Sequence, residues 1–245
     1  MVLWTGVFSA PVIALVAIAY GGSASVADFL TGAAAGAAGA VGLVTPFAGL
    51  GRGQAASVAP ASAALTAVIP VAAAVLLGES PSSLAWLGVV IAVPAIMLCS
   101  WVVEPGEVPF GGLGYGLIAG LGFGGYNVII SLTSYESRLI PLITARGATM
   151  AVVLLVSLFG VWRVGGFRPM PRAIVVGNGV LDVGGNVALL LGLRARSLAL
   201  VSVSSALYPA VTVVMARVVN GERLLSGQVL GLVPTLVAIA IIAVG

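Results

Sequence analysis

Long apolar runs, each sufficient to cross a lipid bilayer as a helix, make up nearly the whole chain. A spanning helix needs about 20 mostly apolar residues. Segments that meet this requirement run approximately over 1–20, 28–50, 54–77, 82–103, 112–134, 138–162, 172–193, 197–219 and 224–245. Only 7% of the residues are charged, whereas soluble domains carry about 25%. We therefore predict an all-α, multi-pass membrane protein with nine transmembrane helices, located in the inner (plasma) membrane of the cell.

The chain also contains an internal repeat that covers an odd number of spans. When the sequence is shifted by 143 residues, 50–102 falls on 193–245, and about a third of the aligned residues are identical, which indicates a duplication. The shift covers five spans. Because five is odd, the second copy should lie upside down relative to the first, as in the inverted repeats of many secondary transporters. We assign the first repeat to 1–103 and the second to 112–245.

The first repeat lacks the counterpart of one helix. The shift that relates the two copies would carry the span 112–134 to positions before Met1. Two interpretations stay open: the natural start lies upstream and supplies one more span, or the protein has nine spans. We favour the upstream start. No basic region precedes the first apolar run, so we expect no cleaved signal peptide.

A Gly-Glu pair recurs at the same place in both copies, as Gly78-Glu79 and Gly221-Glu222. Glycine readily takes the left-handed conformation that ends a helix. A carboxylate that follows it lies near the amino terminus of the next helix, where a negative charge suits the helix dipole. We therefore interpret Glu79 and Glu222 as structural turn residues, with contact to a substrate as the alternative.

The stretch LYPAVTVVMARVVNGERLLSGQVLG, Leu207–Gly231, resembles the last repeat motif of the EamA-type drug/metabolite transporters. The residues that match this motif are Pro209, Gly221, Glu222, Arg223, Leu224, Gln228 and Gly231. The resemblance implies ten helices in two inverted five-helix repeats, a central substrate cavity, and transport of small metabolites or drugs. The absent first helix departs from that plan and puts one wall of the cavity in doubt.

A carboxylate lies in the middle of one apolar span, where an Asp costs about 2.5–3.5 kcal/mol to insert. Asn178 precedes Asp182 by four residues and Asn186 follows it by four, so the three side chains share one helix face. The first repeat has no such polar stripe at the equivalent positions. We expect a substrate or proton site here, with Arg146 in the span 138–162 as a further candidate substrate contact. A purely structural ion pair between Asp182 and Arg146 is the alternative. Burial disfavours the charged form of a carboxylate, so protons are the candidate coupling ion.

Four further polar residues are candidate substrate contacts. Tyr126 and Asn127 lie deep in the span 112–134, where lining the cavity and bonding between helices are equally good explanations. Tyr208 adjoins Pro209, which lacks a backbone N–H and leaves a carbonyl free. Gln54 begins the span 54–77, at a position suited to a cavity mouth.

The residue inventory excludes several classes of function. The chain has no His, one cysteine (Cys99) and no Gly-rich Lys motif for ATP. We therefore expect neither an enzyme nor a cofactor or metal site. The net charge of +3 is too small for a nucleic-acid partner. The predicted function is secondary transport of small molecules, with export by alternating access favoured and a non-transporting membrane scaffold as the alternative. Lipid and a small-molecule substrate are the expected partners, and a homodimer is compatible with the sequence.

Overall fold

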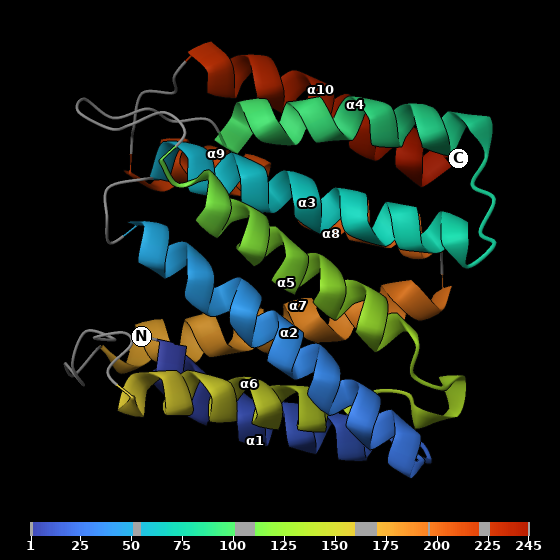
Figure 1. The fold of residues 1–245 in the computed structure, drawn as a ribbon, viewed down its shortest axis with the longest axis vertical. Coiled ribbons are helices and arrows are strands. Elements are labelled where there is room, and N and C mark those ends of the chain that lie inside the picture. The colour runs from blue at the N-terminus through green and yellow to red at the C-terminus, as the bar shows by residue number, and fades with distance from the viewer. Residues whose placement is uncertain are drawn as a thin grey trace. The chain divides into compact units, whose positions relative to one another are not determined.

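The structure of the protein is a computed structural model that describes residues 2–50, 55–100, 111–159, 171–195, 197–220 and 226–244. The described residues form α-helices and one 3-10 turn, with no β-strand among them, so the all-α prediction is confirmed. The elements, shown in Figure 1, are α1 (Val2–Tyr20), α2 (Val26–Leu50), α3 (Ala55–Leu76), α4 (Ser83–Ser100), α5 (Leu113–Ser131), η1 (Tyr135–Ser137), α6 (Pro141–Leu158), α7 (Arg172–Ala195), α8 (Leu198–Ala206), α9 (Tyr208–Asn220) and α10 (Ser226–Val244).

Five helices are long and apolar enough to cross a membrane. Their candidate spans are Val26–Pro46, Val58–Leu76, Leu113–Ser131, Pro141–Leu158 and Ala173–Ala195. Shorter apolar helices cover Thr5–Tyr20, Ser83–Cys99, Leu198–Val211 and Gly227–Ala238. Each of the predicted spans therefore falls on a helix or a helix pair, while the count of nine crossings stays a prediction.

The predicted span 197–219 is not one continuous helix. Helix α8 ends at Ala206, and α9 begins at Tyr208. Between them, the N–H of Leu207 donates to the carbonyl of Ser204 at 3.3 Å, in a tighter turn than the α-helical one. Pro209 in the first turn of α9 has no N–H to donate to the carbonyl four residues earlier, and its ring crowds that carbonyl. The predicted span 197–219 therefore corresponds to two consecutive helices, α8 and α9, rather than to one.

The helices form two compact units, each assembled from separate stretches of the chain. Unit 1 comprises Met1–Ala40 and Tyr126–Ala195, and unit 2 comprises Val41–Gly125 and Arg196–Gly245. Each unit thus takes helices from both of the predicted repeats. The repeat boundaries 1–103 and 112–245 themselves stay a prediction.

In unit 1, α1 packs against α6 and α7, while glycines of α2 allow a close approach to α6. The hydroxyl of Thr149 on α6 donates to the carbonyl of Gly36 on α2 at 2.8 Å. A Cβ at Gly36 would overlap the backbone of Ala145. Small residues permit such contact between membrane helices. The core of the unit consists of Ile13, Ala17, Ala35, Ile130, Leu139, Leu142, Ala145, Val183 and Leu190.

In unit 2, α4 packs along α10 and α3 packs along α8. A Cβ at Gly231 of α10 would lie 2.6 Å from the backbone nitrogen of Cys99 on α4, so only glycine permits this contact. Cys99 is near the carboxyl end of α4 and Gly231 is near the amino end of α10, which makes the two helices antiparallel (Figure 1).

The Gly78-Glu79 turn ends α3 in the expected conformation. Gly78 has a φ of +86°. Its N–H donates to the carbonyl of Val75 at 3.0 Å, and the N–H of Glu79 donates to that of Ala74 at 2.9 Å. These two bonds are the pattern of a Schellman motif, which requires a left-handed residue at the position of Gly78.

The carboxylate of Glu79 caps the amino terminus of α8. It accepts hydrogen bonds from the Ser197 hydroxyl, from the N–H of Leu198 at 2.9 Å and from that of Ala199 at 3.4 Å. We expected this carboxylate at the following helix, α4, and that was wrong. The hydroxyl of Ser82 occupies that place, where it accepts an N–H of the first turn of α4 at 3.1 Å. A polar turn of the first predicted repeat therefore contacts a helix of the second within unit 2.

Candidate functional site

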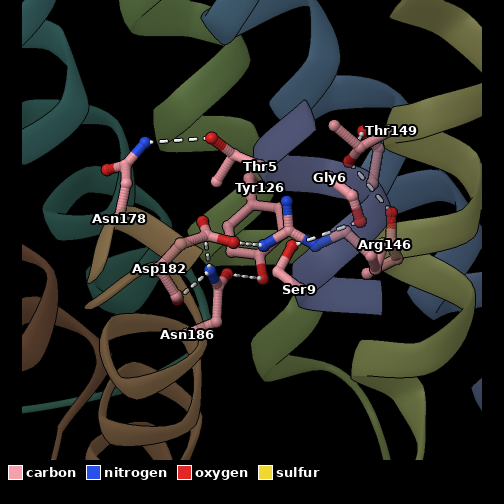
Figure 2. A network of polar contacts seen from close by, with 11 residues as sticks. Thr5, Gly6, Ser9, Tyr126, Arg146, Thr149, Asn178, Asp182 and Asn186 are labelled. Atoms are coloured by element: carbon pink, nitrogen blue, oxygen red, sulfur yellow. Dashed lines mark hydrogen bonds and ion pairs between the residues drawn. The ribbon is translucent and has the colours of Figure 1, made fainter. Parts of the chain in front are cut away.

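An ion pair inside unit 1 joins α6 to α7. The guanidinium of Arg146 donates through Nη2 to Oδ2 of Asp182 (Figure 2). The exposed fractions of the two side chains are 13% and 29%. Both residues lie within candidate membrane spans, where a charge is expensive unless a partner compensates it. The Arg146–Asp182 ion pair that we predicted as the structural alternative is therefore present, and both side chains are partly exposed.

Asn186 connects the Asp182 carboxylate to α5. Its Nδ2 donates to the backbone carbonyl of Asp182 at 2.8 Å and to Oδ1 of the same residue at 3.3 Å. Its Oδ1 accepts a hydrogen bond from the phenol of Tyr126 at 2.9 Å. Figure 2 shows the resulting chain of contacts, Tyr126–Asn186–Asp182–Arg146, which we call the Arg146 network.

Asn178 lies one turn before Asp182 on α7 and makes a hydrogen bond to a different helix. Its Nδ2 donates to the hydroxyl of Thr5 on α1 at 3.1 Å. The polar stripe predicted on α7 thus contacts residues of three other helices, α1, α5 and α6, and all of these residues belong to unit 1. Thr5 was not predicted, because a single threonine near the start of an apolar run carries no distinguishing pattern.

Of the remaining candidate substrate contacts, the structure describes Asn127 and Tyr208. Asn127 is buried, with 4% of its surface exposed, which favours the packing interpretation over a cavity wall. Tyr208 belongs to unit 2 and is 46% exposed at the start of α9. Gln54, Gly221 and Glu222 lie outside the described residues.

A second polar cluster, centred on Asp28, was missed by sequence reasoning. Asp28 is 4% exposed. It accepts the N–H and the hydroxyl of Ser25, at 2.9 and 2.7 Å, and those of Ser134, at 2.6 and 2.9 Å. The hydroxyl of Ser25 in turn accepts the N–H of Asp28 at 3.2 Å. This reciprocal pair is a capping box at the start of α2, and the Ser-x-x-Asp spacing could have revealed it.

Arg194 at the end of α7 completes this cluster. Its guanidinium donates to the carbonyls of Ser134 and Arg138, each at 2.7 Å, and to the Ser137 hydroxyl at 3.2 Å. The guanidinium of Arg138 donates to the carbonyl of Tyr20 at 3.1 Å. These bonds fasten the connection between α5 and α6 to the ends of α1 and α7, so the cluster is a structural clasp of unit 1.

The side chains of the Arg146 network are suited to binding a polar or charged ligand. It presents a permanent cation, a carboxylate, an amide and a phenol on three helices. In the part of the chain that the structure describes, no three His, Cys, Asp or Glu side chains gather as metal ligands would. Hydrogen bonds and charge are therefore what the described site offers to a ligand.

The protein has apolar helices of spanning length, and two of them carry an ion pair. It is therefore an all-helical, multi-pass membrane protein with a polar network inside its spans. The sequence profile of the EamA-like transporter family matches residues 110–244, which is more than half of the chain. The chain belongs to the EamA-like transporter family, as the motif that ends at Gly231 indicated.

Solved structures share the fold. Eight chains of solved structures are similar to this one. One of them, a crystal structure of a protein with 18% sequence identity, has a TM-score of 0.52 and matches 98% of this chain and 96% of that chain. No curated protein sequence matches the chain.

Proposed function

We propose that the protein is a secondary transporter that carries small metabolites or drugs out of the cell across the inner (plasma) membrane. The Arg146 network is the observation that carries this proposal. A membrane scaffold gains nothing from an Asp that costs about 2.5–3.5 kcal/mol to insert at a helix centre. In a secondary transporter, such an Asp can form part of a substrate-binding site near the midplane of the bilayer. Membership of a transporter family supports the same function over catalysis.

Alternating access is part of the proposal, and the pairing of the helices supports it. Under the 143-residue shift, α1 corresponds to α6, α2 to α7, α4 to α10, and α3 to α8 together with α9. The pairs α1–α6, α3–α8 and α4–α10 each pack together within a unit, and the members of each of these pairs run in opposite directions (Figure 1). Antiparallel pairing of equivalent helices is what two inverted repeats produce. Such repeats can exchange conformations and thereby open the site to either side.

Protons are the proposed coupling ion. Asp182 is the carboxylate of the Arg146 network, and protonation would remove the charge that holds Arg146. A proton and a substrate that compete for this carboxylate would move in opposite directions, which suits export. Flux that proved independent of an imposed pH gradient would exclude this coupling.

A growth challenge tests the proposed function. The protein and its Asp182→Asn variant are produced at matched membrane levels in a sensitive bacterial host, which is exposed to amino acids, their toxic analogues and toxic cations. Ser157→Ala serves as the matched control, because the Ser157 hydroxyl bonds only within its own helix, to the carbonyl of Val153 at 2.6 Å. We expect resistance with the unaltered protein and with Ser157→Ala, and its loss with Asp182→Asn.

Two other outcomes would change the proposal. Resistance that survives Asp182→Asn would leave transport standing and make the Arg146 network structural. If the unaltered protein gives no resistance and no change in uptake for any compound, the scaffold alternative replaces transport.

A further inference from the structure

We propose that the Arg146 network selects a zwitterionic substrate, a small molecule that carries both an ammonium and a carboxylate group. This inference rests on the proposed function and adds the chemical class of its substrate. The carboxylate of the substrate would bind the Arg146 guanidinium, and its ammonium would bind the Asp182 carboxylate. The ligand would thus replace each partner of the ion pair with a group of the same charge.

Charge balance carries this inference. The ion pair is neutral as a whole and lies within apolar helices. Taking one charge away from its partner in such surroundings is strongly unfavourable. A monovalent anion at Arg146 would leave Asp182 without its cation, and a monovalent amine at Asp182 would leave Arg146 without its anion. A zwitterion satisfies both residues at once and adds no net charge to the site.

The geometry of the two side chains fits this exchange. A guanidinium presents five N–H donors in a planar fork that matches a carboxylate, and the contact with Asp182 is made through Nη2 alone. Asn186 donates to Oδ1 of Asp182 at 3.3 Å. It therefore continues to hold the carboxylate when Arg146 turns to a ligand. The 29% exposure of the Asp182 side chain leaves it within reach of a small molecule.

Three matched sets of compounds provide the test. Each set contains an amino acid, the amine that lacks its carboxylate and the acid that lacks its ammonium: L-alanine with ethylamine and propionate, L-leucine with isopentylamine and 4-methylpentanoate, and L-phenylalanine with phenethylamine and 3-phenylpropionate. Binding is measured on the purified full-length protein in detergent by ligand-induced thermal stabilisation. We expect at least one amino acid to bind about tenfold more tightly than both of its partial analogues, because each charged hydrogen bond contributes a factor of about ten or more.

Single-charge variants sharpen the test. In Asp182→Asn, the ammonium loses its partner while Arg146 is retained, so the preference should shift from the amino acid to the acid. In Arg146→Gln, the preference should shift to the amine. Ser157→Ala should keep the preference of the unaltered protein. A variant that aggregates is replaced by the charge exchange of Arg146→Asp with Asp182→Arg, which retains one charge of each sign and should keep the amino-acid preference.

The outcomes separate this inference from the proposed function. Binding of an amino acid without any transport in the growth challenge would support the substrate class and contradict the proposed function. Resistance that is confined to amines or to acids, with matching binding, would support transport and overturn the zwitterion. Absence of binding by all three amino acids would also overturn it.

Discussion

At the residue scale, the pairing of Arg146 with Asp182 predicts an unequal response to single and double substitution. Removing one partner leaves a lone charge in apolar surroundings, which costs about 3 kcal/mol or more. Arg146→Gln and Asp182→Asn should each lower the free energy of unfolding by this order. The double variant should recover most of the loss, because it contains no lone charge. Thermal unfolding in detergent measures all three. A double variant as unstable as the sum of the singles would mean that the two side chains act independently.

The phenol of Tyr126 is predicted to support stability and transport by holding Asn186 in place. Tyr126→Phe retains the ring and removes the hydrogen bond to Oδ1 of Asn186, so stability should fall by about 1 kcal/mol and resistance in the growth challenge should weaken. Tyr135→Phe is the control, because it removes a hydroxyl that bonds the carbonyl of Arg194 in the separate clasp of unit 1. Equal loss of resistance in both variants would contradict a specific role for Tyr126.

The residues of the Arg146 network were largely predictable, whereas only the capping box of Ser25 and Asp28 was predictable in the clasp around Asp28. Asp182 and Arg146 are conspicuous because a charge in the middle of an apolar run needs a physical reason. Asp28 and Arg194 lie at span edges, where charged residues are ordinary, so their burial and convergence depend on the packing of distant segments. The bond from Asn178 to Thr5 likewise depends on which helices become neighbours.

At the element scale, the start of α8 is predicted to depend on Glu79. Glu79→Ala removes the acceptor of the Leu198 and Ala199 amides, and the loss of such a cap costs about 1–2 kcal/mol. Glu136→Ala is the matched control, since Glu136 is an exposed glutamate of η1. Thermal unfolding should show a lower midpoint for Glu79→Ala alone. Identical midpoints for both variants would show that the cap contributes nothing.

The contact between α2 and α6 provides a second prediction at this scale. Gly36→Ala would place a methyl group against the backbone of Ala145, and such overpacking costs about 1–3 kcal/mol. A Cβ at Gly177 of α7 meets nothing within 4 Å, so Gly177→Ala should be neutral or slightly stabilising, because alanine favours a helix. The midpoints of thermal unfolding are measured for both variants. If Gly177→Ala lowered the midpoint and Gly36→Ala did not, the observed packing would be contradicted.

Helices were predictable because a run of about 20 apolar residues has few structural alternatives. The break between α8 and α9 was not, since proline is tolerated inside many membrane helices, as Pro94 is in α4. Whether Pro209 interrupts its helix depends on the packing around Leu207, which is buried at 3% exposure. The helix capped by Glu79 also depends on tertiary structure, because both α4 and α8 begin within reach of that turn.

At the scale of the whole molecule, the nine predicted spans determine which connecting segments lie on the same side of the membrane. If each predicted span crosses once, three crossings separate Ser80 from Pro171, and these residues lie on opposite sides of the membrane. Both are exposed in the structure. In a Cys99→Ala background, Ser80→Cys and Pro171→Cys should react with an impermeant thiol reagent from opposite sides of oriented vesicles. Reaction of both from the same side would contradict the nine-span topology.

The grouping of helices into units also exceeds what the sequence predicts. The repeat was visible in the sequence, because duplicated residues keep a fixed spacing of 143. Which helices then pack together is a different matter: each unit combines helices from both copies. Within unit 2, α4 packs against α10 and α3 against α8, and this choice depends on surfaces such as the contact of Gly231 with Cys99 rather than on proximity along the chain.

Counterflow in proteoliposomes is the most direct test of the central claim that the Arg146 network is the substrate site of a transporter. The radiolabelled compound with the largest resistance effect in the growth challenge is supplied outside vesicles that are loaded with the unlabelled compound. We predict saturable accumulation with the unaltered protein and with Ser157→Ala, and none with Asp182→Asn at equal incorporation. Undiminished accumulation with Asp182→Asn would contradict the account.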